Sequence, residues 1–68
     1  MNMNVIEFPD AALIGKIKTF GPFGPSYEIL EPVRQLEDGD WILKVRLVES
    51  GEEVEYRYTH VLDDPKAA

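Results

Sequence analysis

The sequence predicts a small, mainly β domain built as an antiparallel meander of about four strands. Two observations support this prediction. Apolar and polar residues alternate through 41–48 and again through 52–60, as they do in strands with one buried face. Glycine-containing turn sequences separate the extended segments at short intervals, which is typical of hairpins joined in series.

The clearest element is a hairpin formed by residues 41–48 and 52–60. Its alternation assigns one face to the core and the other to solvent. The inward face carries Trp41, Leu43, Val45, Leu47, Val54, Tyr56, Tyr58 and His60. A slip of one residue would turn this whole set outward, so the pattern determines the faces of both strands.

The register of this hairpin depends on its turn. Gly51 can adopt a positive φ, and a loop centred on Ser50 and Gly51 pairs Val45 with Tyr56. The same register pairs Trp41 with His60, Leu43 with Tyr58, Leu47 with Val54, Arg46 with Glu55 and Lys44 with Arg57. The last pair is a like-charge contact, which is unfavourable unless an anion or an acidic side chain lies beside it.

A second turn, with an Asp-Gly pair, precedes the hairpin at residues 37–40. The strand leading into it, 27–36, alternates only in its first residues. Pro32 marks an edge strand or a bulge there, because proline cannot donate to a neighbouring strand. We expect a bend with a change of phase and either Val33 or Leu36 inward. The register of this strand stays open.

A further strand at residues 14–20 would expose Lys16 and Lys18 and bury Ile17. A sheet of this size must cover its apolar face to be stable. Curling into an SH3-like half-barrel, an N-terminal lid or dimerisation would each do so. We favour the curled sheet, since Pro32 and the Gly-Pro pairs supply bending points.

The two ends of the chain carry weaker patterns. Residues 9–13 suit a short helical turn, because proline fits the first helical position, whereas residues 5–8 suit a short strand. With 68 residues the chain is expected to form one domain, with 1–12 and 64–68 less ordered than the rest.

Composition narrows the classes of function. The chain has no cysteine, which excludes disulfides and thiolate metal sites. Its formal net charge of -6 repels nucleic-acid phosphates and anionic membranes. The longest apolar stretch, 11–15, is far shorter than the ~20 residues of a membrane span, and no basic targeting segment is visible. We therefore expect a cytoplasmic bacterial protein without a cofactor.

Catalytic and metal-binding patterns do not stand out. His60 is the single histidine, and without a nucleophile or orienting partner we expect a packed or rim imidazole. The carboxylates gather at 37–40, 49–55 and 63–64 without the spacing of a calcium loop. A single small sheet rarely encloses the cleft that paired catalytic carboxylates need. We therefore expect a protein that is not an enzyme.

The most unusual segment is the tandem Phe-Gly-Pro at residues 20–25. Gly-Pro pairs stiffen a loop, because proline fixes its own φ and restricts the residue before it. One interpretation is that Phe20 and Phe23 seal the end of the core. The other is that they form a rigid aromatic anchor for a protein partner, since such anchors lose little entropy on binding.

Four short motifs stand out in combination. They are Gly-Pro-Phe-Gly-Pro-Ser-Tyr-Glu at 21–28, Asp-Trp at 40–41, Glu-Ser-Gly-Glu at 49–52 followed by Glu-Tyr at 55–56, and Leu-Asp-Asp-Pro at 62–65. From Ile14 onward the chain thereby resembles a family of short, acidic bacterial proteins of unknown function. The resemblance implies a stand-alone bacterial domain and contributes no catalytic residue.

These observations favour a non-enzymatic interaction or regulatory module that binds another protein, or a second copy of itself as a homodimer. The candidate contact residues are Phe20, Phe23, Lys44, Arg46 and Arg57. The alternative is a small-barrel nucleic-acid-binding protein, although the net charge opposes it. It would combine the three cations with exposed Trp41, Tyr56 and Tyr58.

Overall fold

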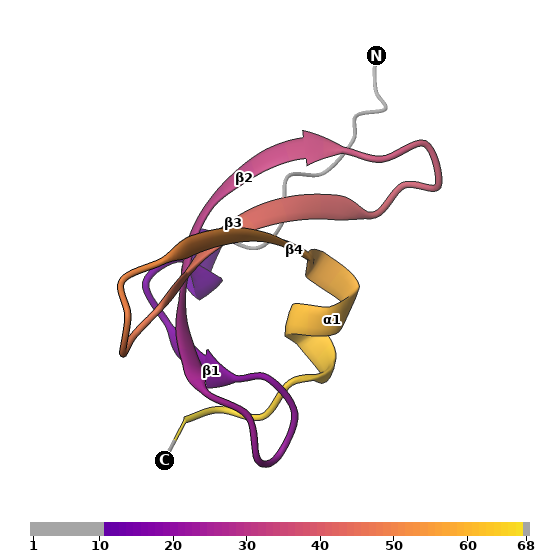
Figure 1. The fold of residues 1–68 in the computed structure, drawn as a ribbon. Helices are drawn as coiled ribbons and strands as arrows, with labels where there is room; N and C mark the ends of the chain where they lie inside the picture. The colour runs from indigo at the N-terminus through magenta and orange to yellow at the C-terminus, as the bar shows by residue number, and fades with distance from the viewer. Residues whose placement is uncertain (1–10, 68) are drawn as a thin grey trace.

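A computed structural model describes residues 11–67 and confirms the mainly β fold. Four antiparallel strands form one sheet in the order β1-β2-β3-β4. The strands are β1 (Ile17–Thr19), β2 (Ser26–Gln35), β3 (Trp41–Leu47) and β4 (Glu53–Arg57). A 3-10 helix (Ala11–Leu13) precedes them and α1 (Tyr58–Asp63) follows. Figure 1 shows the sheet curving around α1, which lies on its concave side.

The 3-10 helix agrees with the helical turn predicted at the N-terminal end, as far as that turn lies in the described part of the chain. The alternative strand at 5–8 lies outside the described residues. Within residues 11–67, no helix has the length and hydropathy of a membrane-spanning segment.

The core lies between the concave face of the sheet and α1. Its buried side chains are Tyr27, Ile29, Leu43, Val45 and Val61. Leu13, Phe20, Trp41, Leu47, Val54, Tyr56 and Tyr58 pack against them. The inward row predicted for 41–48 is confirmed, and each fully buried aliphatic side chain contributes about 1.5–3 kcal/mol.

The β3–β4 hairpin has the predicted faces but a different register. Val45 pairs with Val54 and Lys44 pairs with Glu55. Both pairings differ by two residues from those predicted, so the like-charge pairing of Lys44 with Arg57 is wrong. Because side chains alternate with a period of two, this shift leaves each strand residue on its predicted face.

The turn explains the different register. The loop runs from Val48 to Gly51 and is closed by two backbone hydrogen bonds. The Leu47 N–H donates to the Glu52 carbonyl and the Gly51 N–H donates to the Leu47 carbonyl, each over 2.8 Å. Gly51, with a φ of 76°, occupies the last loop position instead of the centre. That left-handed position favours glycine, and it moves the pairing by two residues.

The end of the segment predicted as a strand over 52–60 is helical, because α1 begins at Tyr58. Asp40 stabilises the first turn of this helix. Its Oδ1 accepts the Thr59 N–H over 3.2 Å and its Oδ2 accepts the Thr59 hydroxyl over 2.8 Å. The carboxylate thus binds an amide that has no partner inside the helix. His60 is consequently exposed on α1, and its predicted place in the inward row is wrong.

Strand β2 bends at Pro32, as predicted. Its pairing with β3 shifts between Ile29 and Pro32 and again between Pro32 and Arg34. Strand β1 pairs only with the first residues of β2, so Pro32 occupies a position where β1 requires no donor. Beyond the bend Val33 is exposed and Leu36 is partly buried.

Strand β1 presents the opposite face to the one predicted. Lys18 is buried, with 9% of its surface exposed, whereas Ile17 is 40% exposed. A bulge just before the strand accounts for this. The Gly15 N–H donates to the Ile29 carbonyl over 2.7 Å, and the Ile29 N–H donates to the Lys16 carbonyl over 2.9 Å. Gly15 and Lys16 therefore lie opposite the single residue Ile29, with Gly15 at a φ of 90°. Such a bulge changes the face of the sheet to which the following side chains point.

Residues 64–67, which were predicted to be loosely held, run beside β1. Lys66 forms an isolated antiparallel bridge with Lys18. The Ala67 N–H donates to the Ile17 carbonyl over 3.1 Å. These contacts cover the outer edge of β1, the side opposite β2.

Candidate functional site

The Phe-Gly-Pro loop, defined here as residues 20–25, connects β1 to β2 and projects from one end of the molecule (Figure 1). Its two phenylalanines lie in opposite environments. Phe20 is partly buried and packs against the core, whereas Phe23 is 98% exposed. The core interpretation therefore applies to Phe20, and Phe23 is accessible to a partner.

Phe20 belongs to a cluster of three aromatic rings. Its ring centroid lies 4.3 Å from that of Tyr27 and 4.9 Å from that of Tyr56, the latter in an edge-on arrangement at 84°. The two tyrosine rings are 5.5 Å apart. Such pairs add about 0.5–1.5 kcal/mol beyond the area they bury, so the first residue of the loop is firmly attached to the core.

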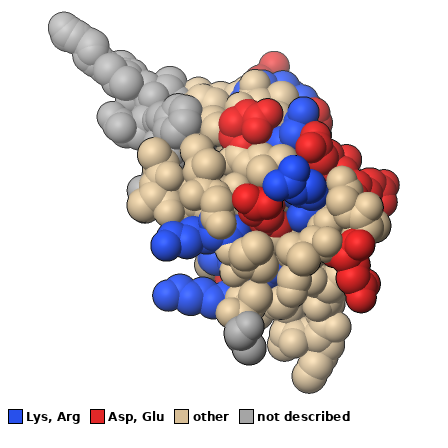
Figure 2. All heavy atoms as spheres, turned by 90° about the vertical axis from the view of Figure 1, so that its left-hand side faces the viewer, with Lys and Arg blue, Asp and Glu red and all other residues tan. Residues whose placement is uncertain are grey.

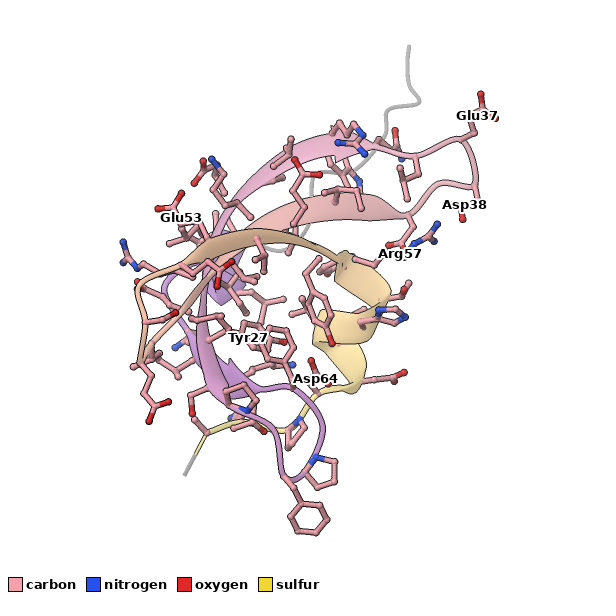
Figure 3. All side chains as sticks on the ribbon, viewed as in Figure 1. Tyr27, Glu37, Asp38, Glu53, Arg57 and Asp64 are labelled. Atoms are coloured by element: carbon pink, nitrogen blue, oxygen red, sulfur yellow. The ribbon has the colours of Figure 1, made fainter. Side chains whose placement is uncertain are left out.

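A single carboxylate joins this cluster to the loop. Asp64 follows α1, and its Oδ1 accepts the Gly21 N–H over 3.0 Å. Its Oδ2 accepts both the Tyr27 hydroxyl and the Tyr56 hydroxyl, each over 2.8 Å. Tyr27 and Asp64 lie close together between the sheet and the end of α1 (Figure 3). The base of the loop is thus bound to the core and to the end of the helix through one side chain.

The electrostatics of Asp64 agree with this arrangement. Burial alone would raise its pKa, but the hydrogen bonds from Tyr27, Tyr56 and Gly21, with the charge of Lys18, hold the pKa below its usual range. Burial and the hydrogen bond to Asp64 raise the pKa of Tyr27, and they raise the pKa of Tyr56 to about 12. At neutral pH the carboxylate is therefore ionised, and both phenols are protonated donors.

The loop also closes on itself. The Phe20 N–H donates to the Pro25 carbonyl over 3.1 Å, and the Thr19 hydroxyl donates to the Gly21 carbonyl over 2.7 Å. At Gly24 a Cβ atom would lie 2.0 Å from the Phe20 carbonyl oxygen, so only glycine fits this close approach. Phe23 stands at the tip of a loop whose two sides are hydrogen-bonded to each other.

A shallow groove of about 300 Å³ adjoins the base of the loop. It is lined by Gly24, Pro25, Ser26, Val48 and Glu49. The Val48 N–H donates to the Ser26 carbonyl over 3.0 Å, and the Val48 side chain is 54% exposed. In Figure 2 an uncharged area extends to the lower end of the molecule, the end at which the loop lies in Figure 1.

The three cations predicted as contact residues are all engaged by carboxylates. Arg46 pairs with Glu28, Lys44 with Glu53 and Glu31, and Arg57 with Asp38 and Asp40, at N–O distances of 2.6–3.9 Å. They form a charge-compensated face instead of a positive patch. Figure 3 shows Arg57 and Asp38 at the same end of the sheet.

Sequence reasoning missed Asp64 and placed Lys18 on the wrong face. The only local pattern at Asp64 is an acidic pair before a proline, which is also typical of a solvated chain end. Its partners come from residues 21, 27 and 56, so the fold alone brings them together. Among residues 11–67, no group of three or more histidine, cysteine or acidic side chains is placed to hold a metal ion.

Comparison with known proteins places the chain among short bacterial proteins. Residues 4–68 match the model of a family described as a family of unknown function, DUF5397. The chain belongs to this family. A Haemophilus influenzae protein described as uncharacterized is 45% identical to this DUF5397 chain over 53 residues, which cover 78% of the chain and 84% of the relative. The predicted resemblance to a family of unknown function is confirmed, and it assigns no activity to the Phe-Gly-Pro loop.

Proposed function

We propose that this DUF5397 protein is a non-enzymatic protein-binding module whose main contact residue is Phe23. The observation that supports the proposal is the 98% exposure of this ring. Burial of a phenylalanine contributes about 1.5–3 kcal/mol, and the fold leaves that contribution unused. Singly exposed apolar residues are common on protein surfaces, so the argument also needs the way in which Phe23 is held.

Phe23 sits on a loop that is ordered before any partner arrives. Asp64 binds the Gly21 N–H, and the Phe20 ring is packed against two tyrosines. Ordering a flexible loop on binding would cost free energy, and a loop already held in place avoids that cost. Large aromatic side chains on such supports are typical interface hot spots.

The chemistry of the partner follows from the surroundings of the ring. Pro22 and Pro25 are exposed on either side of Phe23, and Glu49 lines the neighbouring groove. The whole chain carries a net charge of -6. We therefore infer a partner with an apolar pocket surrounded by basic side chains. Charge complementarity of this kind raises the association rate more than the affinity.

Other partners have less support. A nucleic-acid surface would use Lys44, Arg46 and Arg57, and carboxylates already engage all three. A second copy of the chain is the remaining candidate partner, and it would be recognised by a molecular mass that rises with concentration. We also propose a cytoplasmic location, with which the absence of cysteine is consistent.

The test is co-expression of the tagged chain with the products of the genes that flank its own. We expect a complex with one of them, and we expect Phe23→Ala to weaken it at least tenfold, on the order of 2 kcal/mol for a hot spot. Val33→Ala is the matched control, since Val33 is exposed on β2 and lies outside the loop. A complex that Phe23→Ala leaves unchanged, or no complex with any flanking product, would contradict the proposal.

A further inference from the structure

A second groove lies beside β1. It has a volume of about 380 Å³, which falls within the range of roughly 300–1,000 Å³ typical of small-molecule sites. It is lined by Ala12, Leu13, Lys16, Ile17, Lys18, Lys66 and Ala67, and we call it the β1 groove. We propose that the β1 groove binds a small amphipathic carboxylate, an anionic group carried on a short alkyl chain.

The lysines of the β1 groove differ from the other cations of the chain. The sequence has seven Lys and Arg residues, and four of them have a carboxylate within 4.0 Å. These four are Arg34, Lys44, Arg46 and Arg57. The other three are Lys16, Lys18 and Lys66, which form no such ion pair among residues 11–67. The three lysines that lack an ion pair within the described residues therefore line one groove.

Two of these lysines lie on adjacent backbone segments, because an isolated antiparallel bridge pairs Lys66 with Lys18. Lys18 is buried, and its ammonium donates to the Val61 carbonyl over 2.5 Å. Its charge also lowers the pKa of Asp64. Lys16 and Lys66 are exposed, so their ammonium groups are the ones that can reach an anion in the groove.

Apolar side chains complete the groove. Ile17 is 40% exposed because the bulge at Gly15 turns it outward, and Leu13 packs partly against the core. Together with Ala12 and Ala67 they offer a surface on which an alkyl chain gains affinity with each methylene buried. Figure 2 shows Lys and Arg side chains that project from one side of the molecule, away from most acidic ones.

The net charge selects among anionic ligands. A charge of -6 repels polyanions such as nucleic acids, and it also repels a second copy of the same acidic chain. A ligand with one carboxylate experiences the local field of the lysines with little of this long-range penalty. The apolar lining then favours an alkyl carboxylate over a bare inorganic anion.

The test is an NMR titration of the isotope-labelled full chain with octanoate. We expect amide shifts confined to the β1 groove, at residues such as Ile17 and Ala67. Octanol lacks the negative charge, and acetate lacks the long alkyl chain. Each should therefore bind at least tenfold more weakly than octanoate, on the order of the loss of one charged contact for octanol and of several buried methylenes for acetate. The site is distinct from Phe23, so Phe23→Ala should leave octanoate binding unchanged.

Lysine variants test which side chains of the β1 groove bind the carboxylate. Lys16→Gln and Lys66→Gln alter exposed side chains and should each weaken octanoate about threefold, as expected for a partly exposed ion pair. Lys44→Gln is the matched control outside the groove and should have no effect. Equal binding of octanol and octanoate, unchanged affinity in both groove variants, or no shifts up to the micellar concentration would overturn the proposal.

Discussion

Replacing Asp64 with alanine removes an acceptor that three donors share. The Tyr27 hydroxyl, the Tyr56 hydroxyl and the Gly21 N–H all lose their partner. Tyr27 is fully buried, and a buried unsatisfied donor costs about 1–3 kcal/mol. The other two are partly buried and should cost about 0.5–1.5 kcal/mol each. We therefore expect Asp64→Ala to lower the free energy of unfolding by about 2–6 kcal/mol.

This loss is large for so small a domain. At about 0.05–0.15 kcal/mol per residue, a chain of 68 residues has a total stability of about 3–10 kcal/mol. Urea unfolding followed by circular dichroism would measure the change directly. Asp63→Ala is the matched control, because Asp63 is exposed at the end of α1. It should change stability by no more than about 0.5 kcal/mol.

Two results would refute this reasoning. One is a free energy of unfolding for Asp64→Ala within about 1 kcal/mol of that of the parent protein. The other is a free energy of unfolding that Asp63→Ala lowers as much as Asp64→Ala does. A double-variant cycle sharpens the test. In a Tyr27→Phe background the buried donor is already absent, so Asp64→Ala should cost less there than it does alone.

The same carboxylate makes stability depend on pH. The pKa of Asp64 is lower in the folded chain than its ordinary value, so the unfolded chain binds its proton first as the pH falls. The stabilisation is therefore complete above the unfolded pKa of about 3.9 and is lost as the pH falls through the folded pKa. Asp38 and Asp40 have lowered pKa values as well. Below about pH 4, the free energy of unfolding of Asp64→Ala should fall less steeply with decreasing pH than that of the parent protein. Equal slopes in the two proteins would contradict the assignment of this pH dependence to Asp64.

Two glycine substitutions test the turns by urea unfolding. Gly24→Ala places a Cβ atom 2.0 Å from the Phe20 carbonyl oxygen, and we expect a loss of about 1–3 kcal/mol, as for other overpacked sites. An unchanged midpoint of urea unfolding in Gly24→Ala would mean that the Phe-Gly-Pro loop closes without the close approach of Gly24 to the Phe20 carbonyl. Gly51→Ala forces alanine to a φ of 76° and should cost about 1–2 kcal/mol. If Gly51→Ala matches the parent, the left-handed position does not determine the hairpin register.

The faces of β3 and β4 could be predicted because alternation is a local property of the chain. Val45 and Leu43 are buried as their positions in the alternation required. The register could not be predicted, because it depends on which loop position Gly51 takes. Pro32 bends its strand as expected, since the missing donor is a property of the residue itself.

The failed predictions arise from contacts between distant segments. Thr59 enters a helix because Asp40 binds its amide and hydroxyl from across the fold. Lys18 turns inward because of the bulge at Gly15. Phe20 and Phe23 occupy equivalent places in a repeated motif, so sequence alone could not separate the packed ring from the exposed one.

The most direct measurement compares the unfolding free energies of Phe20→Ala and Phe23→Ala. Phe20 packs in the aromatic cluster, and a partly buried phenylalanine should cost about 2–4 kcal/mol on truncation. Phe23 is 98% exposed, so its truncation should change stability by less than about 0.5 kcal/mol. A Phe23→Ala variant destabilised as much as Phe20→Ala would mean that the second ring serves folding and is not kept free for a partner.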